Sequence, residues 1–151
     1  MVLNTGDQAP DFTLLSDTNE KITLSNLRGK KIVLYFYPKD NTPGCTKEAC
    51  DFRDTFHQFS NENIIILGIS KDKPLTHQKF KKKYELPFIL LTDETGDVCI
   101  AYGAMKEKSL YGRSFLGIER STFLIDEQGI IQTVWRKVSV PGHVEQVYHA
   151  L

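Results

Sequence analysis

The chain has 151 residues, of which 40% are hydrophobic and 25% are charged, a composition typical of one ordinary globular domain. Lys plus Arg and Asp plus Glu number 19 each, which excludes an overall field that would attract nucleic acid or an anionic membrane. No segment approaches the ~20 apolar residues of a membrane span, and the N-terminus has no basic region followed by an apolar stretch. We therefore expect a single cytoplasmic domain over residues 1–151, without a nucleic acid or membrane partner.

The first half of the chain predicts a β-hairpin followed by a parallel βαβ unit. Residues 12–15 and 21–24 are short extended segments separated by a polar turn. Residues 31–37 and 63–70 are continuous apolar runs, typical of strands that are buried on both faces. Between them, apolar side chains recur every three or four positions over residues 43–60, which predicts one amphipathic helix.

The second half of the chain predicts two more helices and three more strands. Residues 74–84 form a helix with a proline in its first turn, and residues 88–91 form a short strand. Residues 121–125 and 130–138 are strands joined by the turn sequence DEQG, and residues 142–151 form the last helix. This order predicts an α/β fold of the thioredoxin-like type, in which helices flank a central mixed sheet in three layers and an N-terminal β-hairpin extends it.

Two cysteines, Cys45 and Cys50, lie five residues apart at the start of the helix expected over residues 43–60. Three cysteines in the whole chain are too few and too odd in number for a secreted disulfide scaffold, so the pair needs a chemical explanation. Prolines on both sides keep residues 38–42 out of a helix and place Cys45 in the first helical turn, with Thr42 as the expected N-cap. Free N–H groups and the helix dipole stabilise an anion there, which favours a reactive thiolate.

Several kinds of functional site contain cysteine pairs, and the number and spacing of the possible ligands exclude some of them. An iron–sulfur cluster held by four thiolates is excluded, and a zinc site lacks a second pair of ligands at the usual spacing. The remaining candidate ligands are Cys99, His57, His77, His143 and His149. Simple packing explains one cysteine but not the second. The spacing C-x-x-x-x-C differs from the C-x-x-C of thioredoxin-type oxidoreductases, and it suits a nucleophile that is oxidised first and then captured by a second thiol.

The segment PKDNTPGCTKEAC, residues 38–50, resembles the active-site signature P-x-x-x-T-x-x-C of peroxiredoxins. Within that family it is most similar to the bacterioferritin comigratory protein/PrxQ subfamily, whose second cysteine follows five residues later. The similarity runs from GDQAPDFTL near the N-terminus to the WRKV and GHVEQV segments near the C-terminus. The resemblance implies a thioredoxin-like fold and a thiol peroxidase that reduces hydrogen peroxide and organic hydroperoxides without haem, flavin or metal.

The resemblance also implies a role for each matching residue. Cys45 corresponds to the peroxidatic cysteine, which peroxide oxidises to a sulfenic acid, and Cys50 to the resolving cysteine, which forms an intramolecular disulfide with it. Thr42 matches the hydroxyl of the peroxide pocket, Pro38 the ring that shields the sulfur from water, and Arg120 the guanidinium beside the thiolate. Because resolution takes place within one chain, the resemblance implies a monomer that thioredoxin or glutaredoxin regenerates.

Two alternative functions stay open at this point. One is a thiol-based redox sensor or disulfide exchange protein that uses the same cysteines, and the other is a noncatalytic interaction module with a thioredoxin fold. The third cysteine, Cys99, matches no catalytic position and is expected to be a packing residue. The chain also lacks the G-G-L-G motif and the C-terminal Y-F helix of peroxiredoxins that excess peroxide inactivates.

Overall fold

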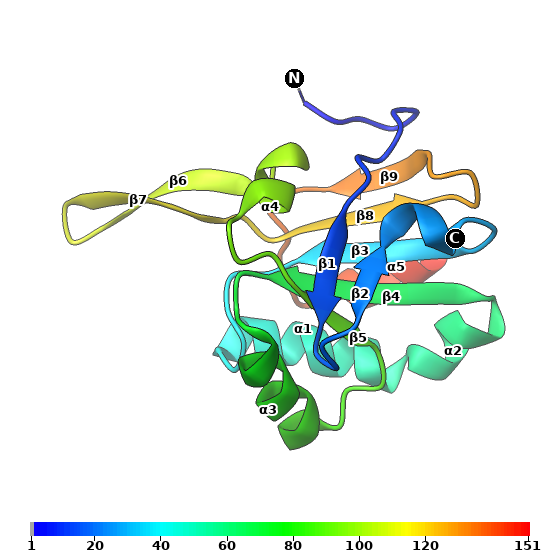
Figure 1. Cartoon of the computed structure of the whole chain (residues 1–151), viewed down its shortest axis with the longest axis horizontal. Helices are drawn as coiled ribbons and strands as arrows, with labels where there is room; N and C mark the ends of the chain where they lie inside the picture. The colour runs from blue at the N-terminus through cyan, green and yellow to red at the C-terminus, as the bar shows by residue number, and fades with distance from the viewer. Residues whose placement is uncertain (1) are drawn as a thin grey trace.

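A seven-stranded mixed sheet forms the centre of the structure, a computed structural model that describes residues 2–151 (Figure 1). The strand order is β2-β1-β5-β4-β3-β8-β9. The three middle strands, β3 (Lys31–Phe36), β4 (Ile64–Ser70) and β5 (Ile89–Thr92), run parallel, since helices connect one to the next. β3 and β4 are buried almost throughout, as expected from their continuous apolar sequences.

Two antiparallel hairpins extend this parallel centre, one on each side. β1 (Thr13–Ser16) and β2 (Lys21–Thr23) pair with each other, and β1 joins the sheet at β5. β8 (Ser121–Ile125) and β9 (Ile131–Trp135) form the second hairpin, which joins the sheet at β3. Both hairpins are confirmed, although β9 ends three residues earlier than the 130–138 expected.

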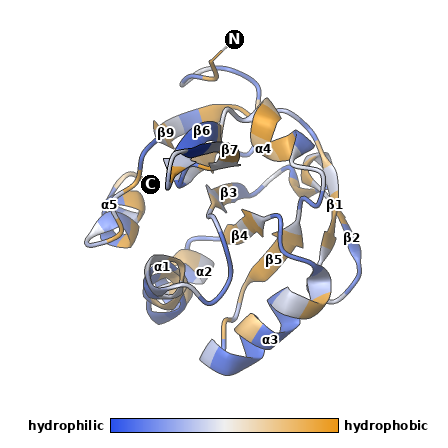
Figure 2. Cartoon of the chain, turned by 90° about the vertical axis from the view of Figure 1, so that its left-hand side faces the viewer, coloured by the Kyte–Doolittle hydropathy of each residue, from blue (hydrophilic) through white to orange (hydrophobic). Residues whose placement is uncertain are grey.

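Four helices cover one face of the sheet (Figure 2). They are α1 (Pro43–Asp54), α2 (Phe56–Asn61), α3 (Pro74–Tyr84) and α5 (His143–His149). The short helix α4 (Asp97–Ala101) and the N-terminal segment cover the opposite face. The thioredoxin-like arrangement of helices around a mixed sheet is therefore confirmed.

Successive residues of β3 contribute to two separate cores, because side chains of a strand alternate between its faces. Val33 and Tyr35 pack under the helices of the first face, whereas Leu34 and Phe36 pack toward α4. The first core includes Cys45, so α1 is anchored to the sheet through the same turn that carries this cysteine.

The single helix expected over residues 43–60 is wrong, because the chain forms α1 and α2 with a break at Thr55. Thr55 leaves the helical conformation with φ −105° and ψ 6°, and its hydroxyl donates to the backbone oxygen of Asp51 at 2.8 Å. The apolar periodicity continues across the break, which is why the sequence pattern does not reveal it. Both cysteines lie on α1, before the break.

A third hairpin was missed from the sequence. β6 (Met105–Leu110) and β7 (Arg113–Ile118) pair antiparallel as a separate two-stranded sheet, which projects away from the central sheet in Figure 1. The short helix α4 and the 3-10 turn η1 (Leu24–Leu27) were missed as well. Within residues 2–151, none of the helices has the length and hydrophobicity needed to cross a membrane.

Candidate active site

Cys45 lies in the first turn of α1, as the sequence predicts. The chain enters α1 from an extended residue, Thr42, with φ −96° and ψ 157°, and Pro43 occupies the first helical turn. The side chain of Cys45 is buried against the sheet, with 2% of the residue exposed. Its sulfur therefore lies at the positive end of a helix of 12 residues, where an anion is favoured.

Thr42 stands at the N-cap position of α1, but its side chain does not cap the helix. The expected N-cap position is therefore confirmed, but the Thr42 Oγ1 donates to the backbone oxygen of Lys39 at 2.8 Å and not into the helix. This bond tightens the loop that leads into the helix. Pro38 is exposed at the start of the same loop, and its shielding of the sulfur stays a prediction.

Arg120 reaches Cys45 from a segment 75 residues further along the chain. It precedes β8 directly, at the edge of the sheet where β8 begins beside the last residue of β3. Its Nη2 donates to the Cys45 Sγ at 3.3 Å, and its Nη1 donates to the Glu48 Oε1 at 2.7 Å. The structure thus brings together the thiol and the guanidinium that the resemblance implies.

Glu48 is part of this site and was missed from the sequence. Its side chain is fully buried, and its Oε2 has no hydrogen-bond partner among residues 2–151. Burial raises the pKa of Glu48 to about 7, against the opposing attraction of Arg120. Glu48 lies three residues after Cys45, a spacing that places both on one side of a helix, and this spacing was the available signal.

Gly44 leaves the room that Arg120 needs. A methyl group added at Gly44 would lie 3.1 Å from Nη2 of Arg120, closer than ordinary van der Waals contact. Any larger residue would displace the guanidinium that contacts Cys45. Glycine at this position therefore contributes to the geometry of the site and not only to the turn.

Tyr35 on β3 forms part of the packing beneath α1. Its ring stacks on Phe52 with a centroid distance of 4.7 Å, and its hydroxyl is buried without a hydrogen-bond partner in the described part of the chain. Burial holds the pKa of Tyr35 well above its usual value, and the negative charge of Glu48 raises it further. The phenol is therefore neutral and adds no charge to the site.

Cys50 lies on α1 as well, half-buried and free. Burial raises the pKa of its thiol. Five helical residues separate two Cα atoms by about 7.5 Å along the axis. A disulfide requires Cα atoms no more than ~7 Å apart with converging Cβ atoms, so Cys45 and Cys50 cannot bond while α1 is intact.

Cys99 lies apart from these residues on α4, where it is completely buried in the core on the other face of the sheet. Burial raises the pKa of the Cys99 thiol, and the nearby Asp93 carboxylate raises it further. The backbone N–H of Cys99 donates to Asp93 Oδ2 at 2.8 Å. The expectation of a packing residue is confirmed by this burial.

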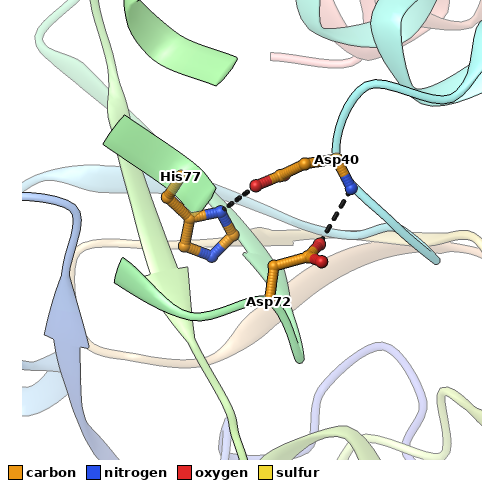
Figure 3. A group of neighbouring side chains, drawn as sticks. All are labelled: Asp40, Asp72 and His77. Carbon is orange, nitrogen blue, oxygen red and sulfur yellow. Dashed lines mark hydrogen bonds and ion pairs between the residues drawn. The ribbon is translucent and has the colours of Figure 1, made fainter. Parts of the chain in front are cut away.

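Among residues 2–151, one group of side chains has the atoms to hold a cation, namely Asp40, Asp72 and His77 (Figure 3). Their candidate ligand atoms lie within 4.8 Å of one another. However, protein groups already engage these atoms: His77 Nδ1 lies 2.6 Å from Asp40 Oδ2, and Asp72 Oδ2 accepts the Asp40 N–H at 2.8 Å. A cation would have to displace these bonds.

Comparison with known proteins assigns the chain to a family. The model of the AhpC/TSA family matches residues 5–134. The Bacillus subtilis peroxiredoxin Bcp is 48% identical over all of this chain and 96% of that protein. A Xylella fastidiosa PrxQ structure has a TM-score of 0.93 at 38% identity, covering 99% of this chain and 95% of that one.

A further solved structure comes from work on alkyl peroxide reduction by the bacterioferritin comigratory protein of Xanthomonas campestris. It has a TM-score of 0.89 at 40% identity and covers 92% of this chain and 88% of that one. These matches extend over nearly the whole chain and include the segment that carries Cys45. The chain therefore belongs to the AhpC/TSA family and is a peroxiredoxin of the Bcp/PrxQ type.

Proposed function

We propose that this peroxiredoxin reduces hydrogen peroxide and organic hydroperoxides with Cys45 as the peroxidatic residue, within one domain of residues 1–151. The observation that carries the proposal is the 3.3 Å contact between Arg120 Nη2 and Cys45 Sγ at the start of a helix. A guanidinium is a fixed cation, and helix N–H groups add positive potential, so both stabilise the thiolate. Alkyl peroxide reduction in the Xanthomonas protein supports the same substrate class here.

In the proposed reaction, the thiolate sulfur attacks one peroxide oxygen as the O–O bond breaks. The sulfur becomes a sulfenic acid, and the departing oxygen takes up a proton to leave as water or an alcohol. Arg120 stabilises the negative charge that grows on the departing oxygen. Thr42 orients the peroxide through its hydroxyl, and Pro38 limits the access of water. The burial of Cys45 supports a reaction in a confined pocket.

Glu48 sets the direction of the Arg120 side chain in this scheme. The 2.7 Å bond to Glu48 occupies Nη1 and leaves Nη2 directed at the sulfur. Because its pKa is about 7, Glu48 changes charge near neutral pH beside the reacting thiol. An ionised Glu48 competes with the thiolate for the one guanidinium, so its charge state tunes the site.

Cys50 resolves the sulfenic acid in the second half of the proposed cycle. Its sulfur attacks Cys45, forms the disulfide and releases water. Since the two cysteines cannot meet within an intact helix, the first turns of α1 must open. Thioredoxin, or glutaredoxin, then reduces the disulfide by thiol exchange. We propose that the enzyme works as a monomer in the cytoplasm, where such reductants operate.

Peroxide consumption coupled to thioredoxin, thioredoxin reductase and NADPH tests this function. The wild type and Cys99→Ser should turn over, whereas Cys45→Ser should not. Cys50→Ser should react once and accumulate the Cys45 sulfenic acid, which mass spectrometry detects. Turnover by Cys45→Ser would refute the assignment, and slow turnover with stable mixed disulfides would favour a redox sensor.

Hydrogen exchange tests the opening of α1. Amides over residues 43–55 should be protected in the reduced protein and should exchange faster once the Cys45–Cys50 disulfide has formed. Amides of the central strand β4 serve as a control within the same sample, because this strand carries no cysteine and is held between β3 and β5. Equal protection in both states, with the disulfide confirmed, would exclude the conformational change.

A further inference from the structure

A buried network holds the loop from which α1 and Cys45 begin (Figure 3). Its centre is Asp40, whose side chain is 1% exposed. Tyr37, directly after β3, donates its hydroxyl proton to Asp40 Oδ1 at 2.5 Å. The side chain of His77, on α3, is fully buried, and its Nδ1 lies 2.6 Å from Asp40 Oδ2. One carboxyl group thus ties the loop to the sheet and to a neighbouring helix.

The same loop is fastened at two more points, one through its backbone and one through a side chain. The N–H of Asp40 donates to Asp72 Oδ2 at 2.8 Å, and Ser70 Oγ donates to the same oxygen at 2.7 Å. The side-chain oxygen of Asn41 accepts from the Tyr84 hydroxyl at 3.2 Å. Because Thr42 follows directly, a shift of these anchors is transmitted to the start of α1.

The hydrogen bonds determine where the protons of this network lie. His77 Nε2 is 3.0 Å from the backbone oxygen of Leu91, which can only accept, so Nε2 carries a proton. Nδ1 faces an Asp40 oxygen, and the Tyr37 proton already serves the other oxygen. The 2.6 Å contact between Nδ1 and Asp40 Oδ2 needs a proton of its own, because the Tyr37 hydroxyl lies farther from Nδ1, at 3.4 Å. With Asp40 ionised, we assign that proton to Nδ1, so both ring nitrogens donate and the ring is an imidazolium. Within residues 2–151, no lysine or arginine pairs with Asp40, so His77 is its counter-ion.

We propose that His77 is a positioning residue for Cys45, and that the proton shared by His77 and Asp40 holds the loop in the form that reacts with peroxide. This inference rests on the peroxidase function proposed above. Without that proton, one ring nitrogen presents a lone pair to either Asp40 or the Leu91 oxygen. Unpaired acceptors are costly in buried surroundings, so the loop leaves α3.

The polar groups around the pair act on its proton in opposite directions: the Asp72 carboxylate favours the proton, whereas the bond from Tyr37 stabilises the ionised Asp40. Burial, and to a smaller extent the Asp40 charge, raises the pKa of both Tyr37 and Tyr35, so the Tyr37 hydroxyl, which follows β3, stays neutral and donates to Asp40. Asp72, after β4, adds a second carboxylate to the cluster. The loop should therefore be released as the pH rises and not as it falls.

Nitrogen-15 NMR of the histidine rings in the reduced protein tests the charge of His77 without any peroxide. We expect both ring nitrogens of His77 to carry protons at neutral pH in the wild type. In Asp40→Asn, the amide can donate to Nδ1 and still accept from Tyr37, so only Nε2 should be protonated. The exposed His57, which lies outside this network, is an internal reference ring. A singly protonated, ordered His77 ring in the wild type would overturn the positioning role.

Single-turnover oxidation of Cys45 in a Cys50→Ser background provides the second test. His77→Phe removes both ring hydrogen bonds and should slow the reaction about tenfold or more through misalignment. Asp40→Asn keeps the hydrogen-bond contacts, so its oxidation rate should fall less than that of His77→Phe. The Asp40→Asn variant needs no shared proton to keep its loop in place. The rate of the wild type, divided by the rate of Asp40→Asn, should therefore fall as the pH rises. His57→Phe is the matched control and should match the wild type.

Identical pH profiles for the wild type and Asp40→Asn would overturn the proposal, as would a folded His77→Phe with the wild-type rate. If His77→Phe does not fold, the pH profile of Asp40→Asn and the NMR spectra of His77 still test the proposal. Peroxide turnover by Cys45→Ser would overturn the proposed function and the positioning role together. A neutral His77 would overturn the positioning role alone.

Discussion

The buried carboxyl of Glu48 should make the stability of the reduced protein depend on pH. Burial raises its pKa from 4.5 to about 7. Between these values the folded chain keeps a proton that the unfolded chain has released, so the free energy of unfolding falls as the pH rises. One pKa unit is worth about 1.4 kcal/mol, which makes the total loss about 3 kcal/mol. Glu48→Gln keeps the shape and an oxygen for Arg120 but cannot ionise, so it avoids this loss.

Urea unfolding at a series of pH values, from below 4.5 to above 7, measures the effect. A Cys45→Ser background for both proteins removes the thiol that contacts the same guanidinium. The unfolding free energy of Glu48→Gln, relative to the reference, should rise by about 3 kcal/mol across the window. Glu62 is exposed at the end of α2, so the difference in unfolding free energy between Glu62→Gln and the reference should not change with pH. A flat difference for Glu48→Gln would refute the reasoning that burial outweighs Arg120.

Two substitutions and one labelling experiment test the packing, two of them near the site and one on the other face of the sheet. In Gly44→Ala, the methyl group 3.1 Å from Arg120 should slow oxidation of the active-site thiol several-fold in stopped-flow measurements. Its stability should not fall, because Ala favours a helix over Gly by up to about 1 kcal/mol, and an unchanged rate would contradict the spacing argument. In Gly68→Ala, the methyl group would lie 2.9 Å from the Tyr35 ring and should destabilise the fold by about 1–3 kcal/mol in urea, so wild-type stability would disprove tight packing there. Buried Cys99, whose pKa is raised, should resist alkylation until the protein unfolds, and rapid labelling of the native protein would contradict its burial.

Some elements could be predicted because their signals lie within the element itself. Helix α3 has the predicted bounds, since Pro74 suits a first turn and the chain turns left-handed at Glu85. β3 and β4 are recognisable as unbroken apolar sequences. The position of Cys45 in a first helical turn follows equally from local rules, because a proline after an extended loop begins the helix.

Other elements lack such a signal. The β6–β7 hairpin stands away from the core, and Tyr111 at its tip is 96% exposed, so its strands show no contrast between a buried and an exposed face. The break at Thr55 is hidden for the opposite reason. Apolar spacing continues through it, because α1 and α2 both pack on the same face of the sheet.

Long-range contacts completed the candidate site. Arg120 lies 75 residues from Cys45 and 72 from Glu48, and only the resemblance to peroxiredoxins linked Arg120 with the thiol beforehand. Asp40 and His77 are 37 residues apart, and nothing in the sequence paired them. A glutamate or histidine on a helix has the same local pattern whether it faces solvent or the interior. Its charge state depends on which distant groups surround it, and only the folded structure decides that.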